Sequence, residues 1–252
     1  MSRLIGYFVA LNRRMCRTID RCLPARISVD GNRDFAESIV PRYVRPGMRV
    51  VDVGGGKTPF FSSDTKQELR LWVVGIDVSD EELARAPASA YDEVFVADIC
   101  DTSLADRADL AVCMTVIEHV ASAKFAIASL ARLVRPGGTV ALFVPCRNAL
   151  FARLNLLLPE AVKRYVLHGL YPASVHFAGF RAYYDHCTPS ELEAVVRQAG
   201  LHLVEKEVYH WSGYFDFFAP FYLCWRAASL LAVALFGEDA CDRFCLVAVR
   251  AE

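Results

Sequence analysis

Residues 50–60 read VVDVGGGKTPF, an apolar run that ends in an acid and three consecutive glycines. Glycines followed by Lys57 and Thr58 suggest a phosphate-binding loop, but that motif needs a glycine where this chain has Val51. The dinucleotide fingerprint G-x-G-x-x-G is incomplete as well, because Pro59 occupies its third glycine position. The stretch therefore predicts a buried strand, a terminal acid and a glycine turn whose backbone a ligand can approach closely.

Further apolar runs rich in β-branched residues follow the first along the chain, with helical patterns between them. The clearest helical patterns cover 118–134 and 188–200, and the second opens with Thr188 as N-cap and Pro189 at the first helical position. Such alternation predicts parallel strands that are buried on both faces. The sequence therefore indicates an α/β fold with a doubly wound sheet. Its predicted strands cover 48–53, 71–76, 93–97, 109–114, 139–144, 201–209 and 244–249.

Three acids, Asp52, Asp77 and Asp98, end three successive predicted strands. Ligands of open parallel sheets lie at the carboxyl ends of the strands. A carboxylate after the second strand can accept hydrogen bonds from both ribose hydroxyls, and an acid after the third suits the amino group of adenine. One such acid is more often a turn former, but three in order beside a glycine turn indicate a nucleoside site.

The chain resembles the class I methyltransferases that use S-adenosylmethionine. The stretches that carry the resemblance are VVDVGGGKTPF, VVGIDVS, VADI, DLAVCMTVIEHV, LVRPGGTVALFVP and YYDHCTPSELEAVVRQAGL. The chain departs from the family pattern at Thr58, where a third glycine is common. The resemblance implies a Rossmann-like methyltransferase fold, a seven-stranded and mostly parallel sheet whose last strand is antiparallel, with helical insertions.

The resemblance also implies which residues bind the cofactor. Asp52 and the backbone of Gly54, Gly55 and Gly56 would hold the methionine part. The remaining cofactor residues by resemblance are Asp77 and Val78 at the ribose, Asp98 and Ile99 at the adenine, and Thr115 beside the sulfonium. Lys57 is interpreted as a solvated residue of the following helix, because a cationic ligand gives no reason for a lysine clamp.

Methyl transfer to a hydroxyl benefits from a positioned base. The candidate bases are His119, His176 and His186. For His119, packing at a helix start or a cofactor contact is the alternative interpretation. The other two bracket the stretch HFAGFRAYYDH, which suits the lining of an acceptor pocket and equally suits a surface loop. The candidate substrate-binding residues within it are Arg181, Tyr183 and Tyr184. No cluster of residues predicts a metal site.

The predicted organisation is an N-terminal amphipathic helix and linker, 1–30, followed by a methyltransferase domain, 31–252. Two insertions interrupt the α/β pattern: 146–187, an acceptor pocket or lid, and 212–242, an apolar segment. The N-terminal stretch has no cleavage site typical of a signal peptide. Its apolar residues recur on one helical face and its arginines on another, which fits a helix packed on the domain or lying on a membrane surface.

Within the second insertion, residues 217–236 carry one charge, Arg226. The length matches a membrane span, but a single crossing would place the last two strands, which the family pairs in one sheet, on opposite sides of the bilayer. Three interpretations remain: packing on the domain, a homodimer interface, or contact with the membrane interface. Together with the basic N-terminal helix, the segment suggests a peripheral membrane contact and an apolar or lipid-linked acceptor.

The overall charge is nearly balanced, with 28 basic and 29 acidic residues, so no nucleic-acid partner is indicated. Nine scattered cysteines without C-x-x-C predict reduced thiols in the cytoplasm. The basic N-terminal helix and the apolar segment suggest that the cytoplasmic protein lies at the inner membrane surface. The predicted function is methyl transfer from S-adenosylmethionine to a small-molecule, glycan or lipid-linked acceptor, with oxygen as the favoured methylated atom. Two alternatives are an NAD-dependent oxidoreductase and a non-catalytic cofactor-binding scaffold that docks a membrane or partner.

Overall fold

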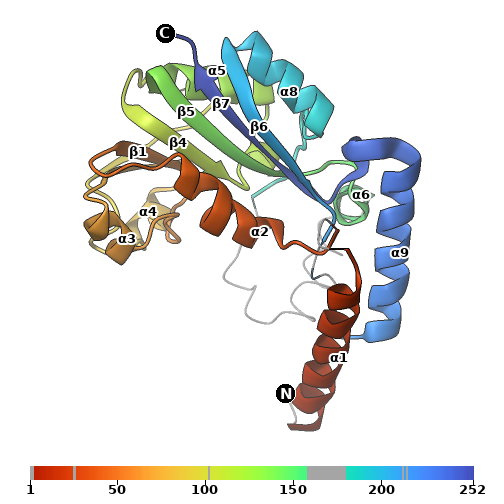
Figure 1. Ribbon diagram of the computed structural model, residues 1–252. Coiled ribbons are helices and arrows are strands. Elements are labelled where there is room, and N and C mark those ends of the chain that lie inside the picture. Colours follow the sequence, from red (N-terminus) through yellow and green to blue (C-terminus); the bar gives the residue numbers. More distant parts are fainter. Residues whose placement is uncertain (1–2, 25–26, 102, 158–179, 212, 214) are drawn as a thin grey trace.

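The computed structural model describes residues 3–24, 27–101, 103–157, 180–211, 213 and 215–252. It contains a seven-stranded sheet of order β3-β2-β1-β4-β5-β7-β6 (Figure 1). Strand β7 pairs antiparallel with β5 and β6, and the other neighbouring strands pair parallel. The predicted fold is confirmed. The strands are β1 (Arg49–Val53), β2 (Trp72–Asp77), β3 (Glu93–Val96), β4 (Ala108–Met114), β5 (Val134–Pro145), β6 (Leu201–Tyr209) and β7 (Arg243–Arg250).

Helices cover both faces of the sheet. Apolar side chains of α5 and α8 pack with Val51 and Leu142 on one face, while Phe35 and Ile39 pack with Val50 on the other. The described α-helices are α1 (Arg3–Cys22), α2 (Gly31–Asp34), α3 (Ser63–Glu68), α4 (Asp80–Ala84), α5 (Ala123–Leu133), α6 (Leu150–Leu157), α8 (Pro189–Gln198) and α9 (Ala219–Phe236). The helix predicted over 118–134 is split: a 3-10 turn, η4 (Ile117–His119), precedes α5, which begins after the N-cap Ser122.

The two predicted insertions leave the same region of the molecule. The first, 146–187, contains α6 and is described again from residue 180, and the second contains α9. Strands β6 and β7 flank α9 and pair along their whole length, from Leu201 opposite Arg250 to Tyr209 opposite Arg243. The segment Ala219–Ala240 is long and apolar enough to cross a membrane. However, because both flanking strands belong to one sheet, α9 cannot carry the chain across a bilayer.

Helix α1 packs along α9, as Figure 1 shows. The Asn12 side chain accepts a hydrogen bond from the Ala219 amide at 2.9 Å. Near the C-terminal end of α1, Asp20 accepts from the Tyr222 hydroxyl at 2.5 Å and from the Trp211 indole at 2.8 Å. The N-terminal helix is therefore fixed to the second insertion by buried polar contacts.

Candidate cofactor and acceptor site

The glycine turn follows β1 and lies at the carboxyl edge of the sheet. Gly54 has φ +74° and Gly56 has φ +47°, a left-handed conformation that favours glycine. A Cβ on Gly54 would lie 2.3 Å from Cγ2 of Val116, the second residue after β4. The Gly54 amide donates to the carbonyl of Ile76 in β2 at 2.7 Å. The turn is thus fitted between the ends of β2 and β4, and no side chain can be added without displacing it.

Asp52 lies beneath this turn. It is buried, and its Oδ2 accepts from the Phe60 amide at 2.8 Å and from the Tyr91 hydroxyl at 3.1 Å. A Cβ on Gly55 would lie 2.2 Å from the same oxygen. Burial raises the pKa of Asp52 to about 6, and the two hydrogen bonds counter part of that rise. The carboxylate therefore holds the loop from 54 to 60 in shape, whatever contact it makes with a ligand.

Tyr91 is a contributor that the sequence analysis did not identify. Its hydroxyl donates to Asp52 and lies 3.2 Å from the carbonyl oxygen of Gly56. Its ring lies over Gly75 in β2, where a Cβ would come within 3.0 Å of three ring atoms. A glycine inside a strand often marks a close approach of another group. Gly75 in VVGID was therefore the sequence feature that could have indicated a ring packed on β2.

Asp77 ends β2 beside the turn. Its Oδ1 accepts from the Ser79 amide at 2.9 Å, and Oδ2 would lie 3.0 Å from a Cβ on Gly56. Burial raises the pKa of this carboxyl. Val78, the next residue, is exposed. A buried carboxylate next to a glycine without a side chain leaves room for a ligand's hydroxyls, so the residues present fit the ribose of a nucleoside ligand.

Lys57 lies in a turn rather than in a helix, and its side chain is partly exposed. Its ammonium lies 3.0 Å from a carboxylate oxygen of Glu82 in α4. Lys57 therefore connects the glycine turn to the helix that follows β2, and its interpretation as a residue of the following helix was wrong.

The third acid lies at the same edge of the sheet. The Ala97 amide donates to the Asp77 carbonyl at 2.9 Å, which joins the chain after β3 to the end of β2. Asp98 is exposed, and its Oδ1 accepts from the Cys100 amide at 2.8 Å. Ile99 is buried. Structure thus places the three predicted acids in the predicted order, while the assignment of Asp98 and Ile99 to an adenine stays a prediction.

The end of β4 forms the other side of the turn. Thr115 has φ +56°, a strained conformation for a β-branched residue, and its amide donates to the Phe143 carbonyl at 2.8 Å. Val116 packs on Gly54, and His119 follows in η4. His119 therefore lies three residues along the chain from the contact with the glycine turn.

His119 is held by the segment that returns from the first insertion. Its Nδ1 lies 3.2 Å from the carbonyl oxygen of Arg181, and its ring packs edge to face on Phe180. A carbonyl only accepts, so Nδ1 carries the proton and Nε2 keeps its lone pair. Nε2 is 3.8 Å from Oε1 of Glu118, too far for a hydrogen bond. Burial lowers the pKa of His119, which keeps the ring neutral at pH 7.

The segment after residue 180 crosses over η4. The amides of Tyr183 and Tyr184 both donate to the Glu118 carbonyl, at 2.7 and 3.0 Å. The guanidinium of Arg181 lies 5.0 Å from the centre of the exposed Tyr183 ring. Tyr184, in contrast, is only 4% exposed and belongs to the main core, which favours packing over substrate binding. The structure thus places the backbone of Arg181 and Tyr183 against η4, which carries His119.

The other two candidate bases have different outcomes. His186 pairs through Nδ1 with Oδ1 of Asp185 at 2.8 Å, and Oδ2 of Asp185 accepts from the Ala123 amide at 2.8 Å. His186 is therefore oriented by a carboxylate that also contacts the start of α5. His176 lies outside the described residues.

Glu118 is a second residue that the sequence did not single out. Its side chain is 4% exposed, and its Oε2 is buried without a hydrogen-bond partner among the described residues. Burial raises its pKa to about 8, so the carboxyl is mostly protonated at pH 7. A neutral acid next to His119 does not raise the basicity of the ring.

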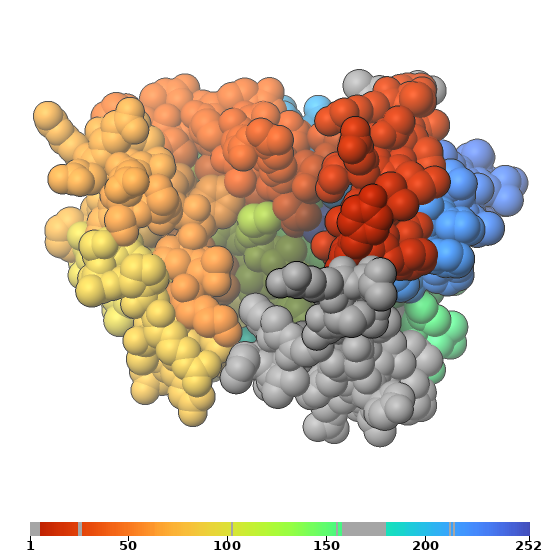
Figure 2. All heavy atoms as spheres, turned by 90° about the horizontal axis from the view of Figure 1, so that it is seen from below, coloured from red at the N-terminus to blue at the C-terminus, as the bar shows by residue number. Residues whose placement is uncertain are grey.

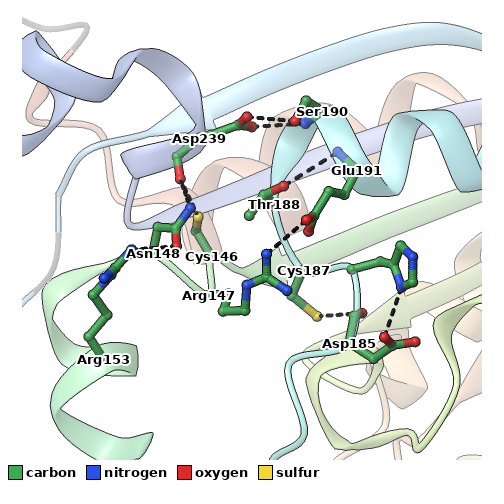
Figure 3. A network of polar contacts seen from close by, with 11 residues as sticks. Cys146, Arg147, Asn148, Arg153, Asp185, Cys187, Thr188, Ser190, Glu191 and Asp239 are labelled. Atoms are coloured by element: carbon green, nitrogen blue, oxygen red, sulfur yellow. Dashed lines mark hydrogen bonds and ion pairs between the residues drawn. The ribbon is translucent and has the colours of Figure 1, made fainter.

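The ends of the two insertions are bound to each other (Figure 3). Asp239, after α9, accepts from the Ser190 amide at 2.9 Å and from its hydroxyl at 2.5 Å, and its carbonyl accepts from Asn148 at 2.9 Å. Arg147 pairs with Glu191 at 2.8 Å. This network fixes the bases of both insertions to the start of α8.

The carboxyl edge of the sheet is hollowed. Figure 2 looks onto this edge and shows a hollow whose floor has the green of the chain around β4 and β5. The rim includes orange residues of the glycine-turn region and the red helix α1. Among the residues that the structure describes, no group of three or more His, Cys, Asp or Glu side chains is placed to hold a metal ion.

A family model described as a methyltransferase domain matches residues 8–206 of the chain. The chain belongs to this methyltransferase family. The protein is thus a methyltransferase, as the resemblance implied, and the interpretations as an NAD-dependent oxidoreductase or a non-catalytic scaffold are set aside. The matched residues include β1 to β5, η4 and α8, so they contain the glycine turn, the three acids and the candidate histidines.

Several known proteins are similar to this methyltransferase. The ubiquinone biosynthesis O-methyltransferase of Burkholderia pseudomallei is 35% identical over 167 residues, 64% of this chain and 67% of that protein. Phosphoethanolamine N-methyltransferase 2 of Haemonchus contortus, solved with S-adenosyl-L-methionine, has a TM-score of 0.55 at 16% identity and covers 95% of this chain and 57% of its own. A putative methyltransferase of Haloferax volcanii, solved with the Trm112 activator, has a TM-score of 0.52 at 20% identity over 97% of this chain and 98% of its own. These two structures show the shared fold alone.

Proposed function

We propose that the protein transfers the methyl group of S-adenosylmethionine to a hydroxyl oxygen of a small molecule. The observation that carries the proposal is His119, a neutral imidazole oriented by a backbone carbonyl three residues from the contact on the glycine turn. The name of the Burkholderia relative, an O-methyltransferase, supports oxygen as the methylated atom. The Haemonchus structure, which holds S-adenosyl-L-methionine in the same fold, supports the cofactor.

The residues at the carboxyl edge suit this cofactor, which supplies an electrophilic methyl group on a sulfonium. The bare glycine backbone at 54–56 would let its methionine part approach closely, and the buried carboxylate of Asp77 can accept from both ribose hydroxyls. Thr115 directly follows β4, between that site and His119. Val78, Asp98 and Ile99 complete the proposed nucleoside contacts.

His119 would act on the acceptor in this scheme. Its Nδ1–H donates to the Arg181 carbonyl. Nε2 would take the hydroxyl proton as the oxygen bonds to the methyl carbon and the bond from that carbon to sulfur breaks, which leaves S-adenosylhomocysteine. Because burial lowers the pKa of His119, the ring is a weak base. A weak base assists an acidic hydroxyl best, and a phenol, with a pKa of about 10, is far more acidic than an alkyl alcohol. We therefore favour a phenolic acceptor.

The surroundings of His119 support an aromatic acceptor as well. Phe180 and Tyr183 are both exposed and both come from the segment that crosses η4. Arg181 lies over the Tyr183 ring and offers a cation beside it. Flat apolar rings with one polar group fit a phenolic ring better than a glycan or an aliphatic amine.

A labelled-methyl assay tests the proposal. The full chain would be incubated with methyl-labelled S-adenosylmethionine and catechol, a long-chain alkylcatechol, an alkyl glucoside or an arylamine, and the products identified by mass spectrometry. We expect methylation of the two catechols at oxygen. Label on the arylamine or the glucoside alone would overturn the phenolic assignment. If the wild-type protein binds no S-adenosylhomocysteine in calorimetry, the site itself is overturned.

Asp77→Ala should weaken binding of S-adenosylhomocysteine by roughly 1.5–3 kcal/mol, because two charge-assisted hydrogen bonds to the ribose are lost. Removing a buried carboxylate should leave the protein folded. Isothermal titration calorimetry measures the change in affinity. Asp77→Asn keeps one acceptor oxygen, so its affinity should lie between those of the wild type and Asp77→Ala. A folded Asp77→Ala protein with unchanged affinity would remove this residue from the site.

Tyr91→Phe should weaken the same binding about fivefold to tenfold, because an intramolecular hydrogen bond contributes about 0.5–1.5 kcal/mol and the glycine turn loses a contact that holds it. The ring remains in place over Gly75. Tyr43→Phe is the matched control, since the Tyr43 hydroxyl donates at 2.7 Å to Glu205 on the edge strand β6, which β4, β5 and β7 separate from β1. Equal losses in both variants would point to a general effect on the fold.

The cellular setting stays part of the proposal. All nine cysteines are free thiols, which agrees with a reducing compartment such as the cytoplasm. The division into an N-terminal helix, 1–30, and a domain, 31–252, is likewise proposed, with α1 held on the second insertion rather than separate from it.

A further inference from the structure

Helix α9 has an inverted distribution of side chains. Every exposed residue between Ala219 and Phe236 is apolar, whereas its buried side includes Arg226 and Ser229. The largest exposed residues are Phe221, Leu223, Leu231, Leu235 and Phe236, the last two 67% and 72% exposed. A helix that faces water normally has polar residues on that side. A contiguous apolar face of this kind marks a contact with something apolar.

Polar groups on the inner side of α9 fix its orientation. Arg226 is 3% exposed and donates to the carbonyls of Ile27, at 2.7 Å, and His210. Its guanidinium also lies 3.5 Å from Asp20 of α1. Rotating α9 to bury its apolar face would expose these groups and break these contacts. The apolar face is therefore held outward by the fold.

Helix α1 extends the surface beside α9. Its exposed apolar residues include Tyr7, Leu11 and Met15. Its exposed arginines are Arg13, Arg14, Arg17 and Arg21, and its single acid, Asp20, is occupied by Tyr222 and Trp211. An apolar face with a basic flank has the character of a segment that lies on an anionic lipid surface.

We propose that the outer faces of α1 and α9 form a docking surface for an anionic lipid bilayer. The pairing of β6 with β7 excludes a crossing, so α9 would lie along the interface with its apolar face among the acyl chains. The arginines of α1 would contact the headgroups. A second copy of the chain fits less well, because a symmetric contact brings the same basic flank of each copy to one interface.

Docking in this way would place the site near the bilayer. Helix α1 forms part of the rim of the hollow at the carboxyl edge of the sheet (Figure 2). An acceptor dissolved in the membrane could then reach the hollow without crossing water. Docking itself requires no methyl transfer, so it can be measured separately from the proposed function.

Flotation with vesicles tests the docking surface. The full chain would be mixed with phosphatidylcholine vesicles containing phosphatidylglycerol, and with vesicles of phosphatidylcholine alone. We expect binding to the anionic vesicles that decreases as salt rises, because the attraction of the arginines is screened. Leu231→Asp with Leu235→Asp should lower vesicle binding at least about tenfold, since the variant loses two apolar side chains that would be buried among the acyl chains. Arg14→Glu with Arg17→Glu should remove most of the salt-dependent part.

Phe125→Asp is the matched control, because Phe125 on α5 is 66% exposed and lies outside both helices. It should bind vesicles as the wild type does, and S-adenosylhomocysteine binding should be unchanged in all variants. Wild-type protein that ignores anionic vesicles at low salt would overturn the proposal, as would α9 variants that bind as well as wild type. A wild-type dimer by light scattering that becomes monomeric in the α9 variants, without vesicle binding in either, would assign the face to a second copy instead.

Discussion

Gly56→Val should abolish binding of S-adenosylhomocysteine, with a rise in Kd of roughly 100-fold or more, while the protein stays folded. Gly56 has φ +47°, a conformation that a β-branched residue adopts only under strain. A Cβ at this position would also lie 3.0 Å from Oδ2 of Asp77 and from Cβ of Glu82. The new side chain would therefore fill the space of the ribose and displace the acid that binds it. Calorimetry with S-adenosylhomocysteine measures the loss.

Gly47→Val separates strain from occlusion. Gly47 has φ +79°, but nothing lies within 4 Å of a Cβ placed there, and it precedes β1 at the opposite edge of the sheet. Its valine variant should lose stability in a thermal melt and keep its affinity for S-adenosylhomocysteine. Normal binding by folded Gly56→Val would mean that no ligand approaches this glycine, and the cofactor site would have to be placed elsewhere.

The positions of strands and strand-terminal acids could be predicted because both depend on local sequence. Apolar β-branched runs favour buried strands, although the edge strand β3 leaves Val94 and Val96 exposed. Asp52 and Asp77 lie within the last two residues of β1 and β2. Parallel pairing then brings these acids to one edge without further information. The helix start at Thr188 was predictable for the same reason, since a cap and its partner Glu191 are three residues apart.

The contacts that support the site depend on residues far apart in the chain. Tyr91 reaches Asp52 across 39 positions, and Arg181 reaches His119 across 62. No periodicity or motif encodes such pairs, because they follow from the way three or more elements pack together. Lys57 was misassigned for this reason: its partner, Glu82, belongs to a helix beyond the next strand.

The apolar segment 217–236 could be recognised from the sequence, but its orientation could not. Composition alone shows one charge, and the structure shows that this charge, Arg226, points inward to two backbone carbonyls. The inverted pattern follows from that contact. The composition instead predicts an arginine that faces water and apolar residues that are buried in the core.

His119→Gln should lower kcat by about 10²- to 10⁴-fold, the usual contribution of a positioned general base, with any catechol that the labelled assay identifies as an acceptor. Cofactor affinity should stay the same, because the side chain is proposed to contact the acceptor. The wild-type rate requires neutral His119, so it should fall as the pH drops through the pKa of this residue. Burial places that pKa below the ordinary 6.5, and the acidic limb should therefore lie below pH 6.5 and disappear in the variant.

Two further histidine variants decide whether the effect belongs to His119. His202, exposed on β6, is a matched control, and His202→Gln should keep the wild-type rate and pH profile. His186 is the rival, because Asp185 orients its ring at 2.8 Å as a carboxylate orients a catalytic base. If His186→Gln loses the rate and the acidic limb while His119→Gln keeps both, His186 is the base and His119 only packs against Phe180. Should neither variant change kcat, the acceptor hydroxyl needs no protein base, and the reaction depends on alignment with the cofactor alone.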